Sequence, residues 1–207
     1  MPAAVWTGRR GDPANVTADI ARVLGSELGL AGPPSAMTLP ADSIGVPAGS
    51  LLPPRERFSG MPAPTHCFVY VDAPAPRPFE LRAAIMSGGS VIRRSMGLGT
   101  LLYAVPLDVP LPARVALGGS SFEGDVVTAG MLNADPTLLQ AAAALTPTVA
   151  GPDPSHSWKV ERLLALEPLT QGAVLLVRTL HRARSTGWTL SAGAVLDLAA
   201  RIETVLR

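Results

Sequence analysis

The chain is poor in charged residues. Only 16% of its 207 residues are charged, whereas 47% are hydrophobic. Soluble proteins usually carry about 25% charged residues. This balance excludes global disorder, which requires low hydrophobicity and a high net charge. It also leaves few charges to cover the surface, so we expect some apolar surface to face a partner.

Cysteine and lysine are almost missing. Cys67 is the single cysteine, which excludes an intrachain disulfide and therefore a secreted disulfide scaffold. Lys159 is the single lysine and lies outside any glycine loop, which excludes a Walker phosphate-binding loop. All other residues of the 17 lysines and arginines are arginines, a bias typical of a GC-rich genome. The formal net charge is +1, so the sequence lacks the basic excess that nucleic-acid-binding domains carry.

Long apolar runs are also missing. No segment approaches the roughly 18 consecutive apolar residues that a membrane span needs. Arg9-Arg10 could begin a twin-arginine export signal, but Asp12, Asp19 and Arg22 interrupt the apolar region that such a signal requires. We therefore expect a cytoplasmic protein, or a soluble fragment of a larger one. Peripheral contact with a membrane stays an open alternative.

The residue patterns predict one α+β domain over residues 1–207. An N-terminal helix is expected over 15–28, capped by Asn15 and ended by Gly29. Residues 31–65 contain eight prolines with scattered large aliphatics, which indicates an ordered wrap over the core and excludes a helix or a central strand. The first part of the domain, 1–65, is therefore a helix and a wrap.

Alternating apolar residues and Gly/Pro-rich connections over 66–128 predict an antiparallel sheet of about four to six strands. In 109–117, Pro110 and Pro112 remove backbone donors on one side only, which predicts an edge strand. Cys67 lies on the apolar face of the first strand and is expected to be an inert core thiol. The expected strands are 66–72, 79–85, 100–105, 109–117 and 122–128.

The last part, 135–207, is expected to be mainly helical and to cover the sheet together with the N-terminal helix. Asp135-Pro136 is a strong helix start, and the helix should run to Leu145. Residues 158–166 fit a strand or a helix. A helical stripe predicts a helix over 169–184, and Ser191 is expected to cap the final helix.

Two groups of arginines are candidate anion sites. Arg93 and Arg94 follow the glycine-rich turn Ser87-Gly88-Gly89-Ser90, where backbone N–H groups and guanidinium groups could hold an anion. Exposed arginines after a hairpin turn are the plainer interpretation. The second group lies near the end of the predicted 169–184 helix, where the helix dipole alone favours positive charge. Its arginines are Arg178, Arg182 and Arg184.

An acidic site is the candidate for catalysis. Glu123 and Asp125 are predicted to share one strand face, with Asp108 nearby in sequence, so they could divide acid and base roles. A solvated strand face carries such pairs routinely. The histidines show no metal-ligand spacing, and no cofactor or metal is expected. His66 is next to Cys67 in the sequence, and adjacent residues of a strand point to opposite faces. These two residues are therefore not expected to form a catalytic couple. The histidines are His66, His156 and His181.

The leading hypothesis is a non-catalytic interaction or scaffold module that forms a twofold dimer or docks on a larger bacterial assembly. The final helix carries Leu196 and Leu206 off the face defined by its other aliphatics, which suggests contact with a neighbour. The alternatives are a small-molecule enzyme with the acidic and histidine site, and an anion- or nucleic-acid-binding domain. The candidate interface residues are Val195, Leu196, Ile202 and Leu206.

Overall fold

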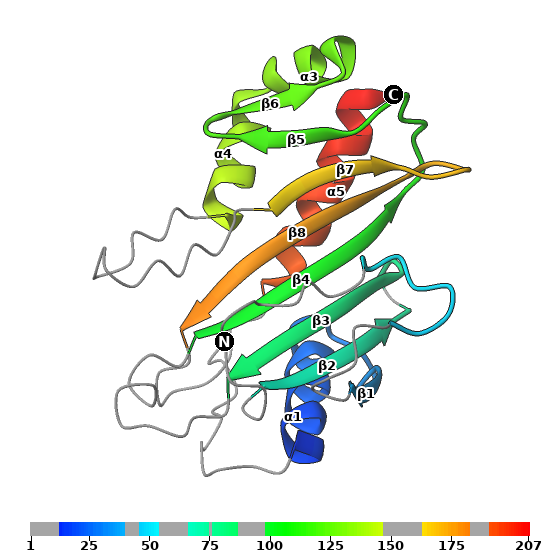
Figure 1. The fold of residues 1–207 in the computed structure, drawn as a ribbon, viewed down its shortest axis with the longest axis vertical. Helices are drawn as coiled ribbons and strands as arrows, with labels where there is room; N and C mark the ends of the chain where they lie inside the picture. The colour runs from blue at the N-terminus through cyan, green and yellow to red at the C-terminus, as the bar shows by residue number, and fades with distance from the viewer. Residues whose placement is uncertain are drawn as a thin grey trace.

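A computed structural model describes residues 13–39, 46–53, 66–74, 76–86, 98–146, 163–182 and 191–207. Its centre is one antiparallel sheet of eight strands in the order β1-β2-β3-β4-β8-β7-β5-β6 (Figure 1). Helices lie at both ends of the chain and between β6 and β7. This arrangement confirms the predicted α+β class. The strands are β1 (Ser35–Leu39), β2 (His66–Ala73), β3 (Phe79–Met86), β4 (Leu98–Leu107), β5 (Val115–Gly118), β6 (Ser121–Gly124), β7 (Leu163–Pro168) and β8 (Ala173–Arg182).

The sheet is larger than predicted because three of its strands lie outside 66–128. Residues 173–182, within the segment 169–184 that was expected to be a helix, form β8 in the middle of the sheet. Its aliphatics point alternately to both faces: Leu175 belongs to the main core, and Leu176 to a second cluster on the opposite face. A strand buried on both faces shows a continuous apolar run, which periodicity alone does not distinguish from a helix. Residues 163–166 of the ambiguous stretch 158–166 belong to β7, which continues to Pro168.

The predicted edge strand over 109–117 is wrong. Its proline-containing part is irregular, and only its end forms β5, which lies between β7 and β6. Pro110 and Pro112 precede the ladder, so their missing N–H groups mark the approach to the strand. The two edges are instead β1 and β6.

Helix α1 (Pro13–Glu27) packs its aliphatic stripe on the sheet, with Ile20 and Leu24 fully buried. It begins two residues before Asn15, so Asn15 lies in its first turn and does not cap it. Gly29 follows the helix with φ 66°, the left-handed conformation expected of a glycine that ends a helix.

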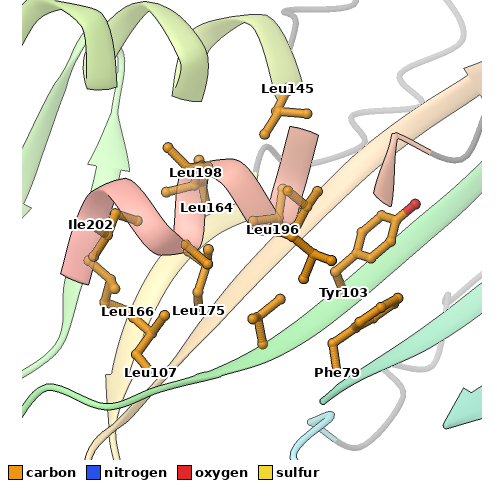
Figure 2. Packing of buried hydrophobic residues seen from close by; sticks show 14 of the residues in the cluster. Phe79, Tyr103, Leu107, Leu145, Leu164, Leu166, Leu175, Leu196, Leu198 and Ile202 are labelled. Carbon is orange, nitrogen blue, oxygen red and sulfur yellow. The ribbon is translucent and has the colours of Figure 1, made fainter. Parts of the chain in front are cut away.

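Helix α5 (Ala192–Leu206) crosses the same face of the sheet (Figure 1). Ser191 occupies the position before it with φ 53°, but its side chain makes no capping hydrogen bond, contrary to the prediction. Figure 2 shows Leu196, Leu198 and Ile202 of α5 among leucines of β7 and β8. These contacts form the largest apolar cluster in the described part of the chain.

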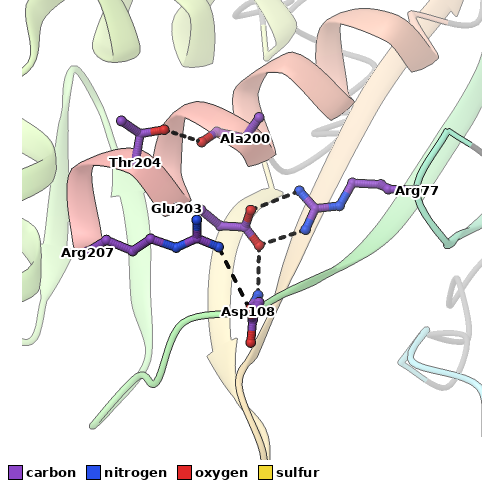
Figure 3. A network of polar contacts seen from close by, with 6 residues as sticks. All are labelled: Arg77, Asp108, Ala200, Glu203, Thr204 and Arg207. Atoms are coloured by element: carbon purple, nitrogen blue, oxygen red, sulfur yellow. Dashed lines mark hydrogen bonds and ion pairs between the residues drawn. The ribbon is translucent and has the colours of Figure 1, made fainter.

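The C-terminal end of α5 is tied to the rest of the protein through Glu203, which is only 8% exposed (Figure 3). Arg77 donates two hydrogen bonds to the Glu203 carboxylate, at 2.6 and 3.2 Å, and the backbone N–H of Asp108 donates a third at 2.7 Å. Burial raises the pKa of Glu203, but these hydrogen bonds outweigh it and hold the pKa below its usual value. The charged carboxylate of Glu203 therefore holds the end of α5 against Arg77 and the backbone of Asp108.

The opposite face of the sheet is covered in part by residues 46–53, which lie within the predicted wrap. The Glu80 carboxylate accepts hydrogen bonds from the backbone N–H groups of Leu51 and Leu52, and Arg82 donates to the carbonyl of Pro53 at 2.6 Å. Burial against this cover, with Glu80 nearby, raises the pKa of Tyr70 to about 12. Residues 40–45 and 54–65 lie outside the described part.

Candidate interaction surface

Helix α3 (Val126–Asn133) begins where the sequence predicted that a strand would continue to residue 128. β6 ends at Gly124, and Asp125 caps the helix by accepting hydrogen bonds from Thr128 N and Thr128 Oγ1, at 2.9 and 2.7 Å. The hydrogen bond from the backbone of Thr128 is the main cause that lowers the pKa of Asp125, and the bond from the Thr128 side chain lowers this pKa further. Asp125 is thus a helix cap, and the predicted strand-face pair with Glu123 does not form.

The last turn of α3 is fixed to the edge of the sheet by Asn133. Its side-chain oxygen accepts from the backbone N–H of Phe122 at 2.7 Å, and its Nδ2 donates to the Phe122 carbonyl at 2.9 Å. One amide thus satisfies both backbone groups of a residue on edge strand β6, which removes them as a template for another strand.

Helix α4 (Pro136–Leu145) starts at Asp135, as the sequence predicted. The Asp135 carboxylate accepts from the N–H groups of Thr137 and Leu138, at 3.0 and 3.1 Å. It also receives two hydrogen bonds from Arg201 of α5, at 2.7 and 2.8 Å, and these are the largest cause that lowers its pKa. The junction between α3 and α4 is therefore locked to α5.

The outward side of α3 is apolar. Its inward residues Thr128, Ala129 and Leu132 are buried, whereas Val126 is 84% exposed and Val127 is 71% exposed. At about 100° per residue, the exposed positions fall on one side of the helix, within an arc of about 140°. A contiguous apolar face on a soluble protein is typical of an interaction site. Its members are Val126, Val127, Gly130, Met131 and Ala134.

Helix α4 also carries no charged residue on its outward side. Asp135 is the only charged residue between 126 and 145, and its carboxylate is bonded within the chain. Surface helices normally carry charged residues on their outward side. We name the outward residues of the two helices and their junction the α3–α4 face. It consists of Val126, Val127, Gly130, Met131, Ala134, Pro136, Thr137, Gln140, Ala143 and Ala144, all exposed.

Of the residues in the predicted anion sites, only Arg178 has a side chain within the described part of the chain. Arg178 lies half-buried in β8 and has an interaction partner, and it is not near a helix C-terminus. Arg182 ends the same strand, and its side chain lies outside the description. Arg93, Arg94 and Arg184 also lie outside the described residues.

The predicted acidic site does not assemble either. The Asp108 side chain is 96% exposed and lies 3.8 Å from Arg207, and the Glu123 carboxylate lies over Gly118 of β5. Among the residues that the structure describes, no three His, Cys, Asp or Glu side chains form a group that could hold a metal. His66 and Cys67 lie in β2 and His181 lies in β8, but the side chains of these three residues are outside the described part of the structure. His156 lies outside the described residues altogether.

The final helix does not offer the predicted contact surface. Val195 and Ile202 are fully buried, Leu196 is 8% exposed, and Leu206 is partly buried against the same core. The broad apolar surface of α5 is used within the chain, between the sheet on one side and α3 and α4 on another. The correction follows from β7 and β8, which form sheet where the sequence left strand or helix open for 158–166 and predicted a helix over 169–184.

Comparison with family models, with curated proteins and with solved structures finds no match to this chain.

Within the described residues, every helix is too short or too polar to cross a membrane.

The Asp125 cap stabilises the start of α3. We expect Asp125→Ala to lower the melting temperature by roughly 2–4 °C, because two hydrogen bonds to Thr128 are lost at the helix start. Asp125→Asn should restore most of this loss, since asparagine caps helices about as well. Thermal unfolding followed by circular dichroism measures both. An equal loss in the two variants would show that charge, and not capping, is what matters at this position.

Proposed function

We propose that this protein is a non-catalytic interaction module that presents the α3–α4 face to a protein partner. The observation that carries the proposal is the charge-free and mostly apolar outward side of two successive helices whose ends are fixed by hydrogen bonds. A face carried by helices that are already formed loses little conformational freedom on binding, which favours association.

The other candidate functions draw no comparable support from the described residues. An enzyme with the acidic site would need Asp108, Glu123 and Asp125 to converge, whereas Asp125 caps a helix and Asp108 points to solvent. An anion site would need several arginines on one surface, and Arg178 is the only member of either predicted group whose side chain is described.

A photoreactive residue in place of Val127 tests the proposal directly. In native host cells, we expect irradiation to yield a discrete crosslinked species, because Val127 belongs to the α3–α4 face and is 71% exposed. The matched control replaces Met37, which is 45% exposed on edge strand β1, at the opposite end of the sheet order. The species should disappear when Val126→Glu is added, since a charge on this face opposes burial.

The proposal fails if the position of Val127 yields no discrete species, or if the position of Met37 yields the same one. It also fails if Val126→Glu leaves the crosslink unchanged while the protein stays folded by circular dichroism.

A further inference from the structure

We infer that the occupant of the α3–α4 face is a second copy of the same chain, with the two α3 helices crossing antiparallel about a twofold axis at Gly130. The inference rests on the proposed function and adds the identity of the partner.

Gly130 is the first observation. It lies inside α3, is exposed, and does not require a left-handed conformation. A Cβ added at Gly130 would meet no atom within 4 Å, so no packing contact inside the chain requires a glycine at this position. Glycine is the least favourable helix-interior residue after proline. Its missing side chain leaves room for something outside the chain to approach the backbone of α3 closely.

The residues around Gly130 indicate that the binding partner contributes a helix. Val126, Gly130 and Ala134 are spaced four residues apart and form one row along α3, with Val127 and Met131 beside it. Helices pack with such rows interdigitated, and small residues at the crossing shorten the distance between the axes. Two copies of α3 satisfy this requirement for each other, because a twofold interface needs only one self-complementary surface.

The charges at the two ends of α3 favour the antiparallel direction. Gly130 lies five residues after Asp125 and five before Asp135. An antiparallel crossing at Gly130 therefore places Asp125 of one copy beside the Asp135–Arg201 pair of the other. Arg201 already neutralises Asp135, and its remaining nitrogen, Nη1, has no partner among the described residues. A parallel crossing would place the two Asp125 carboxylates together, which is repulsive.

The size of the face sets the expected strength. Its ten residues are fewer than the 20–30 that one side of a standard interface contains. Surfaces this small form weak complexes, so we expect a reversible dimer with a Kd in the micromolar range.

Analytical ultracentrifugation of the purified chain from about 1 to 500 µM tests the inference, a range that brackets a micromolar Kd. The wild type should pass from monomer to dimer. Gly130→Leu should weaken the dimer at least tenfold, because each copy then carries a side chain into the crossing. Gly130→Ala should weaken it as well while raising the melting temperature by a few degrees, since alanine favours the helix. Gly193→Ala is the matched control: Gly193 also lies in a helix with nothing within 4 Å of an added Cβ.

Cysteine crosslinking tests the axis and the direction, in a Cys67→Ser background. At protein concentrations where the variant still dimerises, Gly130→Cys should form an intermolecular disulfide, because a residue at a twofold axis meets its own copy and the bond captures the dimer even where the added side chain weakens it. Val126→Cys alone should not, since its copy lies about 12 Å farther along the helices. Combining Val126→Cys with Ala134→Cys should restore crosslinking, because the antiparallel arrangement pairs these two positions.

A wild type that stays monomeric throughout this range overturns the inference, as does a dimer that Gly130→Leu leaves intact. Faster crosslinking of Val126→Cys than of Gly130→Cys overturns the proposed axis. If the chain is monomeric but the Val127 position still crosslinks to a different protein, the proposed function stands and the second-copy inference falls.

Discussion

Leu196→Glu is expected to unfold most of the protein at 25 °C. Leu196 is 8% exposed and packs in the main core between α5 and the sheet (Figure 2). Removing a buried leucine costs about 2–5 kcal/mol, and a carboxylate at that site adds a desolvation penalty. The sum approaches the whole stability of a typical domain, about 5–15 kcal/mol. Urea unfolding followed by circular dichroism measures the loss.

The control for this variant is Ala200→Glu, which introduces the same side chain at an exposed position of the same helix. We expect its unfolding free energy to stay within about 0.5 kcal/mol of wild type, as for most surface substitutions. A folded Leu196→Glu protein that loses self-association would contradict the burial of Leu196. It would restore the interface that the sequence predicted on α5.

Leu196 also shows what the sequence alone could predict. The spacing of Val195, Leu198 and Ile202 correctly predicts the α5 helix and its inner face. Whether Leu196 contacts a neighbour or the same chain depends on what lies beside α5, which helical periodicity does not reveal. The answer lies in β7 and β8, and their fully buried residues lack the alternation that identifies a half-exposed strand.

Candidate sites were predictable only where local rules decide them. Asp135-Pro136 marked the start of α4 because capping is a property of a few consecutive residues. Asp125 followed the same chemistry but went unrecognised, because Val126 and Val127 favour strand by propensity and hid the helix start. The signal that could have revealed the α3–α4 face is the run 126–145, which contains a single charged residue.

Glu203→Gln is expected to lower the unfolding free energy by about 3 kcal/mol at pH 7, because the neutral amide no longer pairs with Arg77 in a largely buried site. The cost comes from the charged hydrogen bonds in Figure 3, of which the amide can keep only weaker versions. The control is Glu167→Gln, whose partner Arg114 is more than half exposed. That surface pair should contribute less than about 1 kcal/mol.

The cost of Glu203→Gln should depend on pH in a definite direction. The pKa of Glu203 is lower in the folded protein than its usual value of about 4.3. A lowered pKa means that the carboxylate stabilises the folded state fully above about pH 4.3 and loses this effect as the pH falls through the folded pKa. The difference in unfolding free energy between wild type and Glu203→Gln should therefore be constant from about pH 6 to 8 and shrink steadily below about pH 4. Urea titrations at a series of pH values give this difference. A difference that stays constant down to pH values where both proteins remain folded would show that Glu203 stabilises α5 through its shape and not through its charge.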